Sequence, residues 1–81
     1  MKFDRIRDLR EDNDYKQIQL ADYLCVTQST YSNYETGIIN IPIEAFIKLS
    51  IYYNTSVDYL LGLTNNPSPY ERNKQGESAN D

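Results

Sequence analysis

The sequence predicts an all-α protein built from five short helices. Apolar residues recur at spacings of three and four, good capping and stop residues separate the helical segments, and the alternation of apolar and polar residues that is typical of strands is nearly absent. The chain has 81 residues, of which 40% are hydrophobic and 25% charged. That length suits one folded domain and excludes two, and we expect this domain to cover residues 1–63.

The first two helices are predicted from their apolar stripes. The stripe of the first helix comprises Phe3, Ile6 and Leu9. The polar run that follows ends this helix near Asp12. A second helix is expected over residues 17–24, and its buried stripe comprises Leu20, Ala21 and Leu24. Lys16 is a poor N-cap, which should cost about 1 kcal/mol relative to Ser or Thr, and Gln19 is placed to reach back to the start of the helix.

Two strong sequence signals mark the start and the end of the third helix. Thr27 is a good N-cap for a helix over Gln28–Glu35, and Gly37 is expected to end that helix in a left-handed conformation. Tyr31 and Tyr34 are three residues apart, so both rings can turn inward together. A turn of only a few residues separates this helix from the second one, which predicts a sharp crossing rather than an antiparallel hairpin.

The fourth and fifth helices are also predicted from their ends. Pro42 suits the first turn of the fourth helix, and Asn54 ends it. Residues that recur at helical spacing within it are Ile43, Phe46, Ile47, Ser50 and Tyr53. Ser56 caps a short fifth helix that Gly62 closes. The residues of that helix expected to face inward are Val57, Leu60 and Leu61.

Residues 64–81 differ in composition from the rest of the chain. They include two prolines and several Asn and Ser residues, and Tyr70 is their one large apolar group. Such a segment cannot bury enough apolar surface to offset its ordering entropy. We therefore expect a polar, largely mobile C-terminal tail.

The composition excludes several classes of function. The chain has no His and a single Cys, which leaves no zinc cluster, no disulfide framework and no His-based acid–base site. We therefore expect no enzymatic activity, no metal and no cofactor. Cys25 has neither a neighbouring base nor a second Cys, so a buried, inert thiol is expected. No apolar stretch approaches the roughly 20 residues of a membrane helix, and we expect a cytoplasmic protein.

The charge is distributed unevenly along the chain. The formal net charge is -4, which argues against nucleic acid binding, but the local field at a docking surface matters more than the total. Within residues 21–63, Lys48 is the one basic side chain. The positive charge available for a polyanion is therefore concentrated towards the N-terminal end.

Short, neutral polar side chains are predicted on the outer side of the third helix. They are Gln28, Ser29, Ser32, Asn33 and Thr36. These side chains can donate and accept hydrogen bonds, which is what reading the edges of DNA bases requires and what packing does not. A helix face that is only solvated usually carries Lys and Glu instead.

Four linked motifs follow one another along the chain. They are the Gln-x-x-Leu-Ala entry to the second helix, the Val-Thr-Gln-Ser turn and cap, the Tyr-Glu-Thr-Gly exit from the third helix, and the final Ser-x-Asp-x-Leu-Leu-Gly. With these motifs, residues 2–63 resemble the Xre and Cro/phage-repressor family of lambda-repressor-like helix-turn-helix domains. The resemblance implies a compact five-helix DNA-binding domain whose third helix lies in the major groove while the second crosses the DNA backbone.

The resemblance also implies roles for individual residues. Base contacts would come from Gln28, Ser29 and Asn33, with Ser32 nearby, and an amide suits a bidentate contact with adenine. Phosphate contacts would come from Lys16, Gln17, Thr27, Thr36 and Asn40. An ion pair is implied between Arg10 and Glu35, and we interpret it as a tether for the third helix rather than as a DNA contact.

The loop Ile38–Ile41 departs from the family pattern. Many members carry Lys or Arg between the third and fourth helices, whereas this loop has three isoleucines and Asn40. The salt-dependent part of DNA affinity should therefore be small, because it scales with the phosphates neutralised. The isoleucines leave a second interpretation open, which is a patch that contacts another protein.

These observations lead to two functional hypotheses. The first is a sequence-specific transcriptional regulator of bacterial or phage origin, a repressor that binds a palindromic operator as a homodimer with half-sites about 34 Å apart. By analogy with the family, dimerisation would use the fifth helix and the loop before it. The alternative is an acidic protein-binding module of the same fold, an antagonist or adaptor of another regulator with little DNA affinity.

Overall fold

The computed structural model describes residues 2–71, which form five α-helices and contain no strand. The helices are α1 (Asp4–Asp12), α2 (Gln17–Leu24), α3 (Gln28–Thr36), α4 (Ile43–Tyr52) and α5 (Val57–Leu61). The prediction of an all-α, five-helix domain is confirmed, and α3 extends one residue beyond its predicted end. In the described part of the chain, no helix combines the length and the apolar character that crossing a membrane would require.

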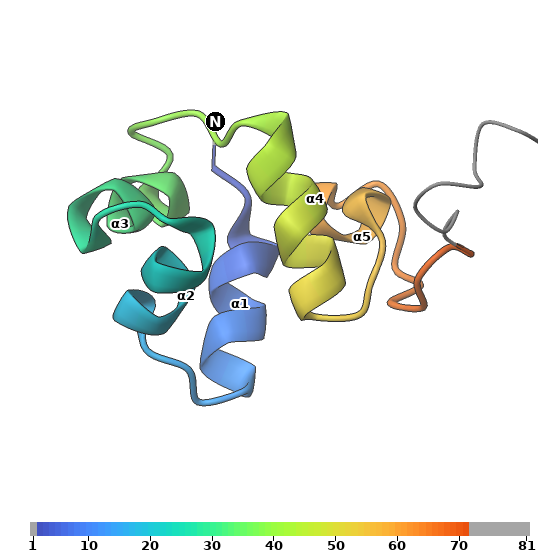
Figure 1. Ribbon diagram of the computed structural model, residues 1–81. Helices are drawn as coiled ribbons and strands as arrows, with labels where there is room; N and C mark the ends of the chain where they lie inside the picture. Colours follow the sequence, from blue (N-terminus) through green and yellow to red (C-terminus); the bar gives the residue numbers. More distant parts are fainter. Residues whose placement is uncertain (1, 72–81) are drawn as a thin grey trace, which may run out of the picture.

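The core lies where α1 meets the other helices. In Figure 1, α1 lies between the α2–α3 pair and the α4–α5 pair, and it contacts α3 on one side and α5 on the other. Every helix supplies apolar side chains to this core. The buried members are Ile6, Leu20, Ala21, Leu24, Tyr31, Tyr34, Ala45, Phe46, Leu49 and Leu60. The predicted inward stripes of α2 and α3 are therefore confirmed.

The start of α2 is stabilised by its own third residue. The backbone N–H of Lys16 donates to Gln19 Oε1 at 2.7 Å, which is one half of a capping box. The lysine ammonium group has no lone pair, so Lys16 cannot supply the other half. The prediction that Gln19 reaches back to the helix start is confirmed.

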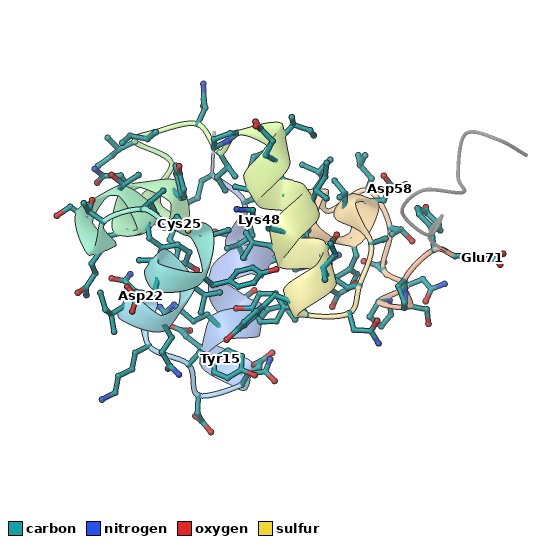
Figure 2. The ribbon with its side chains drawn as sticks, viewed as in Figure 1. Tyr15, Asp22, Cys25, Lys48, Asp58 and Glu71 are labelled. Atoms are coloured by element: carbon teal, nitrogen blue, oxygen red, sulfur yellow. The ribbon has the colours of Figure 1, made fainter. Side chains whose placement is uncertain are left out.

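The turn between α2 and α3 is tight and uses a left-handed residue. Cys25 ends α2 with φ at 60°, and Thr27 Oγ1 accepts a hydrogen bond from the backbone N–H of Thr30 at 3.1 Å to cap α3. The prediction of a buried thiol is wrong, because Cys25 is exposed. The neighbouring Val26 takes the position that packs against the core, which leaves Cys25 at the turn (Figure 2).

The segment that follows α5 contacts the domain at several points as far as Tyr70. Arg5 Nη1 donates to the carbonyl oxygens of Thr64 at 2.7 Å and Tyr59 at 2.9 Å, and Thr55 Oγ1 donates to Pro67 O at 2.6 Å. Backbone carbonyls can be held in this way even where a segment has few apolar side chains. The polar C-terminal tail expected over residues 64–81 stays a prediction: its first residues make these contacts, and residues 72–81 lie outside the described residues.

Replacing Gly37 with alanine should destabilise the fold more than the same change at Gly62. Both glycines have left-handed backbones, with φ of 83° and 81°, so an added Cβ costs about 1 kcal/mol at each. At Gly37 the new Cβ would also lie 3.1 Å from Lys2 Cβ and 3.2 Å from Lys2 Cα, whereas nothing lies within 4 Å at Gly62. Urea denaturation of the two variants measures the difference, and equal losses would exclude close packing of Lys2 on Gly37.

Candidate nucleic-acid interface

Helices α2 and α3 form a helix-turn-helix. The two helices are joined by Cys25, Val26 and Thr27, and the N–H of Val26 donates to Ala21 O at 3.0 Å, which closes the end of α2. In Figure 1, α3 lies at the end of the molecule away from α5. This arrangement leaves one side of α3 free of other helices.

That free side carries the polar residues predicted for it, and we call it the α3 outer face: Gln28, Ser29, Ser32, Asn33 and Thr36. Gln28, Ser29 and Thr36 are exposed, and Ser32 and Asn33 are half-buried. Tyr31 and Tyr34 are buried on the opposite side of the helix. Thr36 Oγ1 donates to Asn33 O at 3.3 Å. Within residues 2–71, the other four side chains form no hydrogen bond, so their donors and acceptors remain available.

Two of the residues predicted to contact phosphate use their side chains inside the protein. Gln17 Nε2 donates to Glu35 Oε1 at 3.2 Å, and the Thr27 hydroxyl caps α3 and donates to Thr30 Oγ1 at 3.0 Å. Lys16 is exposed directly before α2. Gln17 also has the first backbone N–H of α2, one of the groups that lack a partner within a helix.

Arg10 and Glu35 form a buried ion pair that connects α1 to α3. Arg10 Nε lies 2.7 Å from Glu35 Oε2, and Nη2 lies 3.1 Å from Oε1, which is the bidentate geometry that favours an arginine–carboxylate pair. The side chains are only 14% and 3% exposed. Arg10 Nη1 also donates to Tyr15 O at 3.1 Å. With Gln17, this cluster ties together α1, the chain that follows it, α2 and α3.

The cluster keeps its charges in the folded state. Burial by itself would raise the pKa of Glu35, but hydrogen bonds from Arg10 and Gln17 outweigh burial and hold that pKa below its usual value. The hydrogen bond to Glu35 raises the pKa of Arg10 above its usual value. Burial, together with the Glu35 carboxylate, raises the pKa of Tyr31. The ion pair is thus fully charged at neutral pH.

The sequence did not identify Gln17 as a member of this cluster. Gln17 and Glu35 lie on different helices, and the hydrogen bond between them depends on how α2 crosses α3. The short turn between the helices predicts a sharp crossing, but it does not reveal which side chains meet there. The Arg10–Glu35 pair was implied only by the family resemblance, for the same reason.

The loop between α3 and α4 is apolar and largely exposed. Ile38 and Ile39 are exposed, whereas Ile41 packs against the core. The N–H of Ile39 donates to Asn33 O at 3.2 Å, which ties the loop to the C-terminal half of α3. Asn40 is exposed in the same loop. Within the described residues, no group of acidic or Cys side chains is arranged to hold a metal ion.

A helix-turn-helix family pattern matches residues 6–60 of this chain. The chain belongs to the helix-turn-helix family. The predicted relation to Xre and Cro/phage-repressor proteins is confirmed by this match and by the relatives below. Membership also agrees with the prediction that the chain is not an enzyme, because those relatives are described as transcriptional regulators.

Two curated relatives and one solved structure are similar to the chain. It is 37% identical over 65 residues to YobD, an uncharacterized HTH-type transcriptional regulator of Bacillus subtilis (strain 168), covering 80% of this chain and 58% of that protein. It is 36% identical over 62 residues to the HTH-type transcriptional regulator AnsR of the same strain, covering 76% and 53%. A transcriptional regulator from Listeria innocua superposes with a TM-score of 0.70 at 26% identity, covering 93% of this chain and 64% of that one. The chain thus spans little more than half the length of the curated relatives.

Proposed function

We propose that this chain is a sequence-specific DNA-binding transcriptional regulator that reads the major groove of an operator with the α3 outer face. One observation carries the proposal. Tyr31 and Tyr34 fill the inner side of α3, and four of the five neutral polar side chains on the opposite side form no hydrogen bond within residues 2–71. The groups on that side match the donors and acceptors on the edges of base pairs.

Base recognition is assigned to four residues. Gln28 and Asn33 carry amides that can both donate to and accept from the edge of an adenine, and the hydroxyls of Ser29 and Ser32 can serve either function. Gln28 and Ser29 lie in the first turn of α3, the end of a recognition helix that approaches the bases in helix-turn-helix proteins.

Phosphate contacts are assigned to residues at the edges of the α3 outer face and near it. The proposed set is Lys16, Gln17, Thr27, Thr36 and Asn40. Because the side chains of Gln17 and Thr27 have partners inside the protein, we assign their contribution to backbone N–H groups near the starts of α2 and α3, where the helix dipole favours an anion. Lys16 alone in this set carries a positive charge, so affinity should depend weakly on salt.

We further propose that the regulator acts as a repressor in the cytoplasm of a bacterium and binds a palindromic operator as a homodimer. A second copy doubles the base contacts and offsets the small number of phosphate charges neutralised by each copy. Two recognition helices on one face of DNA require half-sites about 34 Å apart.

A second candidate function is supported by the loop between α3 and α4. Ile38 and Ile39 are exposed beside the α3 outer face, and the net charge of the chain is -4. A partner protein that docks on Ile38–Ile41 would make the chain an antagonist or adaptor of another regulator. Such a module would have little affinity for DNA.

Selection of bound sites from random duplex DNA tests the two functions. We expect enrichment of one palindromic sequence at low salt, with affinity that falls only slightly as salt is raised. The physical reason is that base contacts by neutral side chains release no counterions. Absence of any enriched site at low salt would contradict DNA recognition and leave the protein-binding function.

A further inference from the structure

Helix α4 has two apolar sides, and only one of them is buried. The inner side contains Ala45, Phe46 and Leu49. The outer side contains Ile43, Ile47 and Ile51, which we call the α4 face, and these side chains are 62%, 47% and 53% exposed. They are four residues apart, so they form one continuous ridge along the helix. A contiguous apolar patch on a small domain is typical of an interaction site.

A groove extends the α4 face towards α5. The groove has a volume of about 720 Å³, and its apolar lining comprises Ile47, Ile51, Val57 and Tyr70. Ile47 and Ile51 thus belong to both the ridge and one wall of the groove. A partner surface with its own apolar ridge could place a side chain in this groove.

Part of the surface of α5 is occupied by other segments of the chain. The Arg5 guanidinium stacks 4.1 Å from the centre of the Tyr59 ring and holds the carbonyl of Thr64. Tyr70 donates to Asp58 Oδ2 at 2.7 Å. These contacts therefore occupy one part of the surface around α5, whereas the three isoleucines of the α4 face are exposed.

Two charged residues flank the α4 face on one side. Glu44 and Lys48 follow Ile43 and Ile47 in the sequence, are exposed, and form no ion pair within residues 2–71. Figure 2 shows Lys48 on the side of α4 that faces α2. When two identical helices pack antiparallel about a two-fold axis, the same flank of both helices lies on one side of the interface. The residues along that flank then run in opposite directions in the two copies. Glu44 of each copy then approaches Lys48 of the other, so the charge pattern is self-complementary.

We propose that a second copy of this chain docks on the α4 face, with the two α4 helices antiparallel and Ile47 at the two-fold axis. In that register Ile43 packs near Ile51 of the partner subunit, and the two flanking charges pair across the interface. The interface replaces the α5-centred contact expected by analogy with the family. Its role in operator binding rests on the proposed function, but the association itself requires no DNA.

The dimer should be weak in the absence of DNA. Stable complexes usually bury about 800 Å² on each partner, and three half-exposed isoleucines with their neighbours supply less than that. We expect dissociation at about 10 to 100 µM chain. Two half-sites on one DNA molecule raise the effective concentration of the second copy and would favour the dimer there.

Sedimentation velocity of the whole chain without DNA, over about 5 to 500 µM, tests the proposal. The wild-type chain should shift from monomer to dimer with concentration, and Ile47→Glu should remain monomeric because two carboxylates would face each other at the axis. Ile18→Glu, a change at an exposed isoleucine of α2, is the matched control and should dimerise like the wild type. Thermal unfolding of each variant at low concentration verifies that it is folded.

A charge exchange tests the antiparallel register. Glu44→Lys and Lys48→Glu should each weaken dimerisation several-fold, because each places like charges together, and the double variant should restore it. A wild-type chain that stays monomeric to the highest concentration, or an Ile47→Glu variant that still dimerises, would overturn the proposal. A folded double variant that does not regain dimerisation would overturn the proposal as well.

The same variants separate this proposal from the proposed function. Binding to a single half-site needs only one copy, so folded monomeric variants should retain it if the regulator function is correct. Dimerisation without any DNA binding would therefore refute the function and keep the interface. Half-site binding by a wild-type chain that never dimerises would refute the interface and keep the function.

Discussion

Glu35→Ala is expected to lower the free energy of unfolding by about 3 kcal/mol. The variant leaves the Arg10 guanidinium, only 14% exposed, without its carboxylate, and removing one partner of a buried ion pair typically costs that much. The Gln17 amide also loses its acceptor. Urea denaturation at neutral pH measures the loss, and a matching decrease in DNA binding is expected because the same pair fixes α3 against α1.

The control for this prediction is Glu11→Ala. Glu11 also lies near Arg10, at 3.9 Å, but its side chain is 58% exposed. An exposed pair contributes little, so this variant should change stability by less than about 1 kcal/mol. Equal stability of the two variants would show that the Arg10–Glu35 pair is not a tether.

The same pair makes the stability of the domain sensitive to acid. The pKa of Glu35 in the folded state is held below its usual value, while in the unfolded chain it is about 4.3. The contribution of this group is therefore fully present above about pH 4.3 and is lost as the pH falls through the lower, folded-state pKa. Glu35→Gln has no carboxylate at this position, so its stability should fall less steeply over that acid range.

Asn33→Ala is expected to remove the preference for one base position of the operator. If Asn33 makes a bidentate contact with an adenine, the loss for that base is about 1 to 3 kcal/mol, or roughly five- to 150-fold in affinity. Other positions of the site should keep their preferences. Competition binding with operators that differ by single base pairs measures the change at each position.

Lys16→Ala is the comparison for that experiment. A lost phosphate contact weakens all sequences about equally and lowers the slope of affinity against salt by about one. Asn33→Ala should leave that slope unchanged. A uniform loss in Asn33→Ala would assign this residue to the DNA backbone and contradict its role in reading bases.

The ends of the helices could be predicted from the sequence because local chemistry determines them. Thr27 and Ser56 cap α3 and α5 through their hydroxyls, and Gly37 and Gly62 adopt the left-handed conformation expected of them. The sides of α4 could not be predicted in the same way. Phe46 and Ile47 are both large and apolar, and periodicity alone does not reveal that one is buried and the other exposed.

The outward side of α3 could be predicted from the sequence, but the contacts that support this helix could not. The polar pattern from Gln28 to Thr36 indicates which side of α3 faces outward because the two tyrosines need the core. The hydrogen bond from Gln17 to Glu35 and the Arg5 contacts with residues 59 and 64 join segments far apart in the sequence. Only the packed arrangement of the helices brings those groups together.

The uncharged α3 outer face has a consequence for how such a regulator would search a genome. A basic recognition surface is retained on random DNA by its attraction to phosphates, and many molecules are sequestered there at any time. A surface of amides and hydroxyls releases wrong sites quickly. Few copies per cell would then suffice to keep one operator occupied, and occupancy would respond promptly when synthesis of the protein starts or stops.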